Sequence, residues 1–161
     1  MLGALSVEPM TGYAVRAAIT STLGHFWSES FGQIYPALER LVAADLVTRD
    51  DDRRFAITDA GRDRLRELLG EPIEAVPPRN GLLLRLFFGR TLGREGCIEL
   101  LEQTRDQAHR TLTEMAAIRA EVEAETDSPD QAFFLVTIAA GEAGARAQLQ
   151  WADESIALLR G

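Results

Sequence analysis

Between residues 24 and 41, apolar and polar positions follow the period of a helix. The apolar positions recur at steps of three and four, at Phe31, Ile34, Leu38 and Leu41. The other side carries a small polar stripe, formed by Gln33, Ala37 and Arg40. Gln and Arg are the side chains that bind adenine and guanine edges with two hydrogen bonds in a DNA major groove. The pattern therefore predicts a helix with one face for a core and one face free to contact a partner.

The start of this helix is marked by a capping signal and complicated by a proline. Ser30 followed by Gln33 has the form of a capping box, and Ser28 with Phe31 gives an alternative start. Pro36 would remove a backbone hydrogen bond and kink the helix interior, at a cost of roughly 3 kcal/mol. A costly residue at this place suggests that the helix has a particular shape.

The segment before this helix predicts two more. Residues 2–6 are apolar and favour a short first helix, which a turn follows. Thr11 can then cap a second helix that runs to about Leu23 and ends at Gly24.

The segment after it changes to a shorter period. Over residues 46–57, two short strands joined by a tight turn at residues 50–52 fit best. Thr58 then caps a helix that ends at Gly70. The order of three helices, a hairpin and a helix is that of a winged helix-turn-helix, which places its last helix before the wing in the major groove.

The second half of the chain predicts helices alone. Residues 71–80 carry three prolines and indicate a linker, and residues 81–89 form a short, very apolar helix. Two long helices follow, from Arg94 to about Glu125 and from about Asp130 to Leu159. In the first of them, a repeat of seven residues links Leu101, Ala108, Met115 and Val122.

The expected fold is thus mainly α with a small β-hairpin. It comprises a winged helix-turn-helix DNA-binding domain over residues 1–70, a linker over 71–80 and a helical dimerisation domain over 81–161.

Two long helices by themselves would leave apolar surface exposed. The short helix before them adds three consecutive leucines and two phenylalanines, and residues 139–147 are small enough to let another helix approach closely. An intertwined homodimer would cover this apolar surface most simply, and a self-contained three-helix bundle is the alternative. The residues expected in the dimer interface are Leu83, Leu84, Phe87, Leu101, Leu112, Met115, Ile138, Leu149, Trp151 and Ile156.

The net charge of −8 over 161 residues argues against a simple nucleic-acid-binding surface. Residues 1–70 hold eight arginines against ten acidic residues, and the rest holds nine against fifteen, so the acid excess lies mainly in the second half. If the first half binds DNA, its arginines must cluster on one side. Every basic side chain is Arg, for which a bias of the genome toward Arg codons is the plainer explanation.

Several features predict a cytoplasmic protein. No apolar run reaches the roughly 18 residues of a membrane span, and the N-terminus lacks the basic region of a signal peptide. The single cysteine, Cys97, cannot form an internal disulfide and is expected to be a buried thiol in a reducing compartment.

Catalysis has no support in the sequence. His25, His109 and Cys97 lack the spacing of metal ligands, and there is no glycine-rich phosphate loop or nucleophile elbow. We therefore expect no enzyme activity, no cofactor and no metal.

DNA binding rests on a combination of side chains in the right order. Gln33 and Arg40 flank the small Ala37, and Tyr35 adds a hydroxyl. Early on the preceding helix, Tyr13 and Arg16 suit a phosphate contact. The wing is flanked by three arginines, Arg49, Arg53 and Arg54.

The wing tip opposes this interpretation, because it consists of three aspartates that phosphates would repel. Either the tip points away while its arginine flanks contact DNA, or the wing contributes little.

Three blocks of the first half carry a family pattern: LGALSVEPMTGYAV at 2–15, WSESFGQIYPALERL at 27–41 and FAITDAGRDRL at 55–65. In these blocks and in their spacing, the first half of the chain resembles the PadR family of transcriptional regulators. The GQIYPAL motif distinguishes this family from other winged-helix groups such as MarR-like proteins. The second half resembles the longer PadR members, whose C-terminal helices make the dimer.

This resemblance implies a homodimeric repressor that binds a roughly palindromic operator, often near its own gene. The DNA contacts implied by position are Tyr13, Ser28, Ser30, Gln33, Tyr35, Pro36, Arg40, Arg53 and Arg54. The chain departs from the family pattern at Asp45, where a glycine is common, and at Phe55, where a tyrosine is common.

Some relatives bind phenolic acids or cationic drugs and release DNA, which raises the question of a small aromatic effector here. The aromatic residues that could line a pocket, between the domains or at the dimer centre, are Phe87, Phe88, Phe133, Phe134 and Trp151. Their alternative role is in a core. The alternative function of the whole chain, favoured by its negative charge and acidic wing, is a winged-helix protein-interaction adaptor with weak or no DNA binding.

Overall fold

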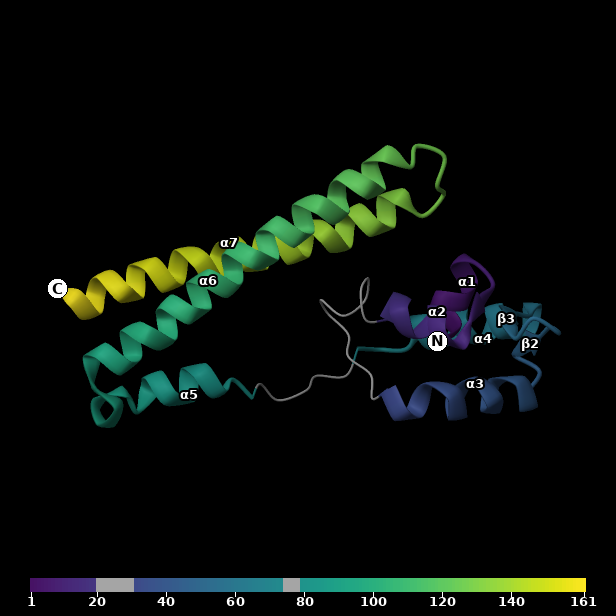
Figure 1. Ribbon diagram of the computed structural model, residues 1–161, viewed down its shortest axis with the longest axis horizontal. Helices are drawn as coiled ribbons and strands as arrows, with labels where there is room; N and C mark the ends of the chain where they lie inside the picture. Colours follow the sequence, from purple (N-terminus) through teal and green to yellow (C-terminus); the bar gives the residue numbers. More distant parts are fainter. Residues whose placement is uncertain (20–30, 74–78) are drawn as a thin grey trace. The chain divides into compact units, whose positions relative to one another are not determined.

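The computed structural model describes residues 1–19, 31–73 and 79–161 (Figure 1). It divides into two compact units, Met1–Val76 and Pro77–Gly161. In their described parts, the first holds four α-helices, a short 3-10 helix and a small sheet, and the second consists of helices. The expected fold class, mainly α-helical with a small β-hairpin, is confirmed.

The helices of the first unit are α1 (Leu2–Val7), α2 (Gly12–Ala18), α3 (Ile34–Ala43) and α4 (Asp59–Gly70). Both threonine caps predicted from the sequence are present. The Thr11 hydroxyl accepts a hydrogen bond from the Ala14 N–H at 3.2 Å, and the Thr58 hydroxyl accepts one from the Gly61 N–H at 3.0 Å. The predicted end of α2, at Leu23 and Gly24, lies outside the described residues.

A three-stranded antiparallel sheet completes the first unit. The predicted hairpin is formed by β2 (Val47–Arg49) and β3 (Arg54–Ile57), and β1 (Met10–Thr11) pairs with the other edge of β3. The sequence had suggested only a turn at residues 8–12. A strand of two residues is too short to show an alternating pattern, and it exists because Met10 and Thr11 pair with Phe55 and Arg54.

The core of the first unit draws on every kind of element. Its fully buried side chains are Leu5, Val15, Ile34, Leu38 and Val47, with Phe55 almost completely enclosed. Ile34 and Leu38, each with 0% exposure, confirm the predicted apolar face of α3.

The start of α3 differs from the prediction. A short 3-10 helix over residues 31–33 precedes it, and Pro36 is only the third residue of α3. The predicted interior kink is therefore wrong, because an N–H in the first turn has no acceptor within the helix and a proline there removes nothing. Gln33 makes no side-chain capping bond, and its expected partner Ser30 lies outside the described residues.

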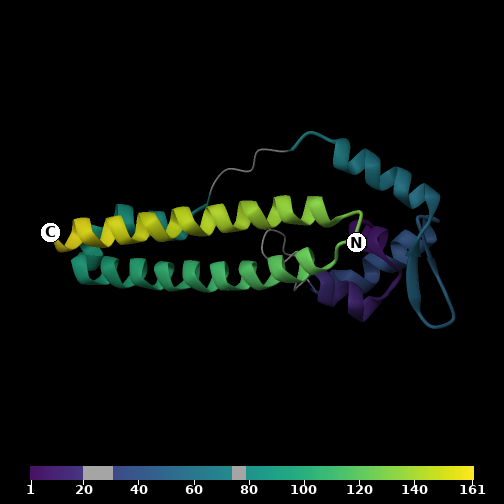
Figure 2. The same ribbon diagram turned by 90° about the horizontal axis from the view of Figure 1, so that it is seen from above.

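The second unit contains α5 (Gly81–Phe87), α6 (Gly89–Ala124) and α7 (Gln131–Arg160). Gly93 interrupts α6 with a left-handed backbone, φ 83°, so the long straight part begins at Arg94 as predicted. Figure 2 shows α6 and α7 running side by side in opposite directions, joined by the turn at residues 125–130.

The seam between α6 and α7 matches large residues with small ones. Three members of the predicted heptad, Leu101, Ala108 and Met115, are buried, and α7 contributes Ile138, Ala145 and Ala152, again seven residues apart. A Cβ atom on Gly141 would lie 3.1 Å from the Met115 sulfur. The small residues at 139–147 thus let α6 of the same chain approach α7 closely.

One charged residue is buried in this seam. Glu142 accepts hydrogen bonds from Arg119 at 2.8 Å and from Arg146 at 3.1 Å. The hydrogen bond from Arg119 is the main reason that the pKa of the Glu142 carboxyl lies below its ordinary value. Desolvation raises this pKa, and the hydrogen bond from Arg146 lowers it further.

Among the described helices, none is long and apolar enough to cross a membrane.

Candidate nucleic-acid interface

The outward face of α3 carries the polar side chains that the sequence singled out. Gln33, Tyr35, Pro36 and Arg40 are all exposed, and Ala37 is half-buried. Burial of Ile34 and Leu38 on the inner face fixes the rotation of the helix about its own axis. The structure therefore exposes all four predicted contact residues, and the helix period puts Gln33, Pro36 and Arg40 on one side of α3 and Tyr35 on another.

The start of α2 lies against this surface. A Cβ atom on Gly12 would lie 2.5 Å from the Tyr35 ring, so glycine lets this ring lie directly against the start of α2. The next residue, Tyr13, is 74% exposed. Tyr13 and Tyr35 thus extend the surface at the helix starts, where hydroxyl groups suit phosphate contacts. Ser28 and Ser30, also predicted contacts, lie outside the described residues.

The turn of the wing is a tight loop that Asp50 stabilises. The Asp50 carboxylate accepts a hydrogen bond from the Arg54 N–H at 2.8 Å, and the Asp50 carbonyl accepts one from the Arg53 N–H at 3.1 Å. Arg53 has φ 59°, the left-handed conformation that follows a type I turn in a three-residue hairpin loop. Asp50 therefore has a structural role, which leaves Asp51 and Asp52 as the acidic tip.

The arginines that flank the wing differ in what they do. The Arg49 guanidinium forms an ion pair with Glu39 of α3 at 3.0 Å and lies 5.5 Å from the centre of the Phe55 ring. The Arg54 guanidinium donates to the Pro9 carbonyl at 2.7 Å, which ties β3 to the loop before β1. Both side chains therefore hold the wing in place.

Two exposed arginines, Arg40 and Arg53, have guanidinium groups that are available to a ligand. Within the described part of the chain, neither the Arg40 nor the Arg53 guanidinium forms a hydrogen bond or ion pair. Both are exposed. They are the guanidinium groups that could engage a phosphate or a guanine edge without first breaking an internal contact.

The described residues hold no group of three or more histidine, cysteine or carboxylate side chains that could bind a metal ion. The surface around α3 is thus one of exposed amide, phenol and guanidinium groups on a rigid helix.

Comparison with known proteins agrees with this geometry. Residues 1–67 match the model of the transcriptional regulator PadR-like family, and residues 78–160 match that of the virulence activator alpha C-terminal domain. The chain belongs to the PadR family of transcriptional regulators. This family is one of regulators and not of enzymes.

Relatives extend over nearly the whole chain. The negative transcriptional regulator PadR of Bacillus subtilis is 23% identical over 174 residues, which cover 99% of this chain and 94% of the relative. Solved structures with the same fold include a PadR-like regulator from Bacillus cereus, with a TM-score of 0.84 at 20% identity, covering 99% of this chain and 94% of the other. The virulence activator AphA of Vibrio cholerae gives 0.77 at 25% identity, covering 99% and 95%.

Structures of Bacillus subtilis PadR include complexes with operator DNA and with p-coumaric acid. The complex with DNA has a TM-score of 0.80 at 21% identity, covering 98% of this chain and 94% of the other.

In this PadR-family chain, the five aromatic residues proposed for an effector do not lie together. Phe87 and Trp151 line a cavity of about 710 Å³ formed by α5, α6 and α7. Phe88 lines a second cavity, of about 510 Å³, between α5 and α6. Phe133 and Phe134, at the start of α7, line neither.

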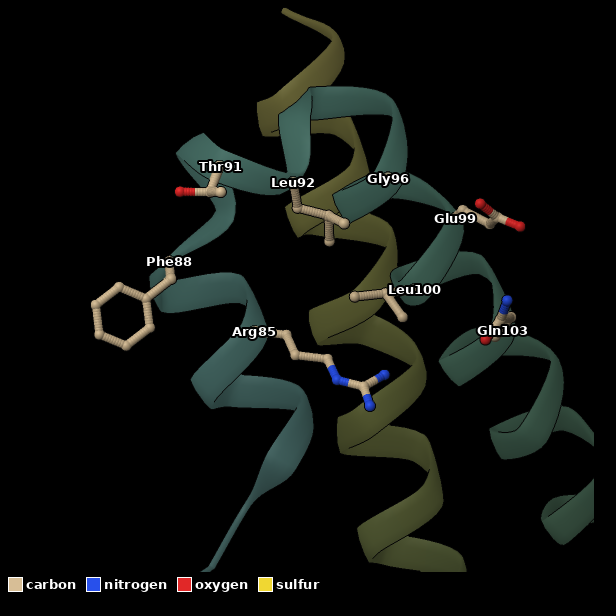
Figure 3. Close-up of a pocket in the computed structure, with 8 residues that line it drawn as sticks. All are labelled: Arg85, Phe88, Thr91, Leu92, Gly96, Glu99, Leu100 and Gln103. Atoms are coloured by element: carbon tan, nitrogen blue, oxygen red, sulfur yellow. The ribbon is translucent and has the colours of Figure 1, made fainter.

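The second cavity is shown in Figure 3. Leu92 and Leu100 form its apolar floor, and the Arg85 side chain reaches between the helices toward Leu100. The Phe88 ring points away from α6.

The residues expected in a dimer interface separate into three groups. Leu83, Leu84 and Phe87 are exposed, and Leu112, Leu149 and Trp151 are half-buried. The remaining four, Leu101, Met115, Ile138 and Ile156, are each at most 5% exposed within the single chain. These four pack between α6 and α7 of one chain, so they have little surface left for a partner.

Proposed function

We propose that this PadR-family regulator is a homodimeric repressor that inserts α3 into the major groove of a palindromic operator. The observation that carries this proposal is the division of α3 into a buried face, with Ile34 and Leu38, and an exposed face, with Gln33 and Arg40. The role as repressor is supported by the full-length similarity to the negative regulator of Bacillus subtilis.

We assign the base contacts to Gln33 and Arg40 and the phosphate contacts to Tyr13, Tyr35 and Arg53. Arg54 has a positioning role, because its guanidinium is bonded to the Pro9 carbonyl. Pro36 lies on the same exposed face as the base contacts, where it shapes the surface without donating a hydrogen bond.

Footprinting on the region upstream of the chain's own gene tests the proposal. We expect two protected half-sites with centres about one helical turn apart, roughly 34–36 Å, as for a two-fold dimer. A reporter driven by the same region should be less active when the regulator is present. Absence of DNA binding at moderate salt would favour the adaptor instead.

Variants of α3 test the assigned base contacts. Arg40→Ala and Gln33→Ala should each cost about 1–3 kcal/mol of operator binding and relax specificity at one base pair. Arg66→Ala is the matched control, since Arg66 is also exposed, on α4, but is paired with Asp63 at 2.6 Å. Equal losses in all three variants would mean that α3 has no special part in operator binding.

Arg53→Gly offers a sharper test, because it should stabilise the hairpin and at the same time weaken DNA binding. A non-glycine residue in the left-handed region costs about 1–2 kcal/mol, so Arg53→Gly should stabilise the hairpin slightly. The same substitution should weaken binding to all DNA sequences and lower the slope of log K against log salt by about 1. Unchanged binding in a salt titration would remove the wing from the interface.

Dimerisation and effector binding complete the proposal. Light scattering at micromolar concentration should give the mass of two chains, and a monomer would contradict the dimer.

We propose a small aromatic effector that releases DNA, by analogy with the p-coumaric acid complex of the relative. The cavity beside Trp151 supports this, since its volume of about 710 Å³ is that of a typical small-molecule site.

Fluorescence of Trp151 tests the effector, in a Trp27→Phe chain that retains operator binding. Planar aromatic acids should quench or shift the emission and release the operator. A flat response across such a panel, with DNA binding intact, would exclude this part of the proposal.

A further inference from the structure

The helix α3 carries one carboxylate, Glu39, which was not among the contacts predicted from the sequence. Its side chain is 57% exposed. If α3 enters a DNA groove, the phosphates on both sides of the groove repel such a group. A carboxylate at this place therefore opposes DNA binding unless it is neutralised or makes a contact of its own.

The helix period turns Glu39 outward. The buried face of α3 is centred between Ile34 and Leu38, and Pro36 lies opposite that centre. At about 100° per residue, Gln33 and Glu39 lie about 60° on either side of Pro36. Glu39 therefore faces away from the core to the same extent as Gln33, one of the proposed base contacts.

The two oxygens of the Glu39 carboxylate differ in their contacts. Oε1 accepts a hydrogen bond from the Arg49 guanidinium at 3.0 Å. Within the ranges that the structure describes, Oε2 accepts none. One oxygen thus fixes the group, and the other stays available as an acceptor.

Arg49 is itself held in place. The strand β2 follows α3 and lies beside its C-terminal end (Figure 1). The Arg49 guanidinium lies 5.5 Å from the centre of the Phe55 ring, which is 2% exposed. A cation held by a buried ring both orients the carboxylate and neutralises its charge toward phosphates. Glu39 therefore enters a groove already positioned and paired.

The chemistry of a carboxylate limits what it can contact there. An ionised carboxylate accepts hydrogen bonds and donates none. In the major groove, cytosine presents its N4 amino donor, whereas guanine and thymine present acceptors, and adenine presents a donor beside an acceptor. The free oxygen of Glu39 therefore favours cytosine and disfavours guanine and thymine.

We infer that Glu39, held by Arg49, contacts the N4 amino group of a cytosine in each half-site and is a specificity-determining residue of α3. This inference rests on the proposed insertion of α3 into the major groove and adds a base contact to those of Gln33 and Arg40. Neighbouring Cα atoms are about 3.8 Å apart and stacked bases about 3.4 Å. The cytosine should therefore lie within about two base pairs of the one that Arg40 contacts.

Competition titrations of the full chain on variants of the footprinted operator test this inference. Each base pair is replaced in turn by the other three, symmetrically in both half-sites. The wild type should prefer cytosine about tenfold at one position, and Glu39→Ala should bind all four bases there about equally. Glu39→Gln should move the preference to adenine, because an amide forms two hydrogen bonds with the adenine edge.

Two further variants serve as controls. Glu67→Gln is the matched one, since Glu67 is exposed on α4 and paired with Arg64 at 2.9 Å, and it should keep every base preference of the wild type. Arg49→Ala should weaken binding to all sequences and reduce the cytosine preference without moving it to another base. The ratio of two affinities of one variant does not depend on how much of that variant is folded, so a purely structural role would leave these preferences unchanged.

The outcomes separate this inference from the proposed function. Unchanged base preferences in Glu39→Ala and Glu39→Gln overturn the inference alone. A uniform rise in affinity would then mean that Glu39 only repels phosphates, and a uniform fall would mean that it only supports the wing. A wild-type chain that does not bind the operator overturns the proposed function, and the inference with it.

Discussion

The two units of this regulator cover their apolar residues to different extents. In the first, eight buried residues from helices and strands form a continuous core, and the large apolar side chains that remain exposed include Val7, Leu68, Leu69 and Ile73. In the second, the buried cluster where α5 meets α6 and α7 consists of Ile98, Leu101 and Ile156. Leucine, phenylalanine and valine side chains stay exposed at both of its ends.

The difference follows from the number of layers. Helices on a sheet enclose a core from several sides, whereas two paired helices touch along one seam only. The first unit therefore completes its core alone and can expose polar groups for DNA. The second exposes apolar groups, which suits a surface that another chain covers.

Gly61→Ala is the substitution with the largest expected effect, and it should unfold the first unit while the second stays folded. A Cβ atom there would collide with the Leu46 carbonyl oxygen and lie 2.8 Å from an Ile57 side-chain carbon. Because a backbone carbonyl cannot move aside, we expect a loss of about 3 kcal/mol or more, which is most of the stability of a small unit. DNA binding should disappear while light scattering still gives a dimer.

Gly3→Ala is the control for this substitution. A Cβ atom on Gly3 meets nothing within 4 Å, so alanine there should leave the unit intact or stabilise it slightly. If Gly61→Ala also abolished the dimer, the second unit would depend on the first and the contrast drawn above would fail.

The sequence predicted most of the helices because their ends carry local signals. Thr11 and Thr58 are caps whose hydroxyls bond within three residues, and Gly93 marks the start of the long straight helix. The buried faces of α3 and α6 followed from periodicity alone. These features depend on neighbours in the chain, which a single sequence displays.

The features that the sequence missed depend on partners far along the chain. The Arg54 guanidinium donates to the carbonyl of Pro9, 45 residues away, a contact that no local signal in the sequence displays. The ion pairs of Glu142 join two helices, with Arg119 lying 23 residues earlier. The predicted dimer interface likewise included Leu101 and Ile156, because periodicity shows that a side is buried and not which chain buries it.

Glu142→Gln has the second-largest expected effect and tests the packing between α6 and α7 in the second unit. Among the described residues, Glu142 is the charged side chain that is buried. Its pKa is lowered in the folded chain, so its ion pairs stabilise the seam above the ordinary value of 4.5 and lose that contribution as the pH falls through the folded pKa. The melting temperature of the second unit should therefore fall more on acidification in the wild type than in the variant.

Thermal melts followed by circular dichroism between about pH 6 and about pH 3 provide the measurement. Glu154→Gln is the matched control on the same helix, since Glu154 is exposed and accepts a hydrogen bond from Gln150 at 2.8 Å. Its melting should show the pH dependence of the wild type. Equal acid sensitivity in all three chains would show that the buried triad does not govern the seam.

Asp45→Gly is the smallest expected effect and concerns the first unit alone. Asp45 follows α3 with φ 57°, and its N–H and that of Leu46 donate to the carbonyls of Val42 and Leu41 at 3.0 Å each, the hydrogen bonds of a Schellman cap. Glycine favours this conformation, so the variant should be more stable by about 0.5–1 kcal/mol after the added freedom of the unfolded chain is counted.

Hydrogen exchange in the full chain can locate that gain. The amides of α3 and the sheet should be better protected in Asp45→Gly, whereas those of α6 and α7 should be unchanged. Ala44→Gly is the neighbouring control, because Ala44 has φ −95° and glycine there should destabilise the unit by a similar amount. A gain in protection that reached α7 would mean that the two units unfold as one, and that the core of the first also stabilises the second.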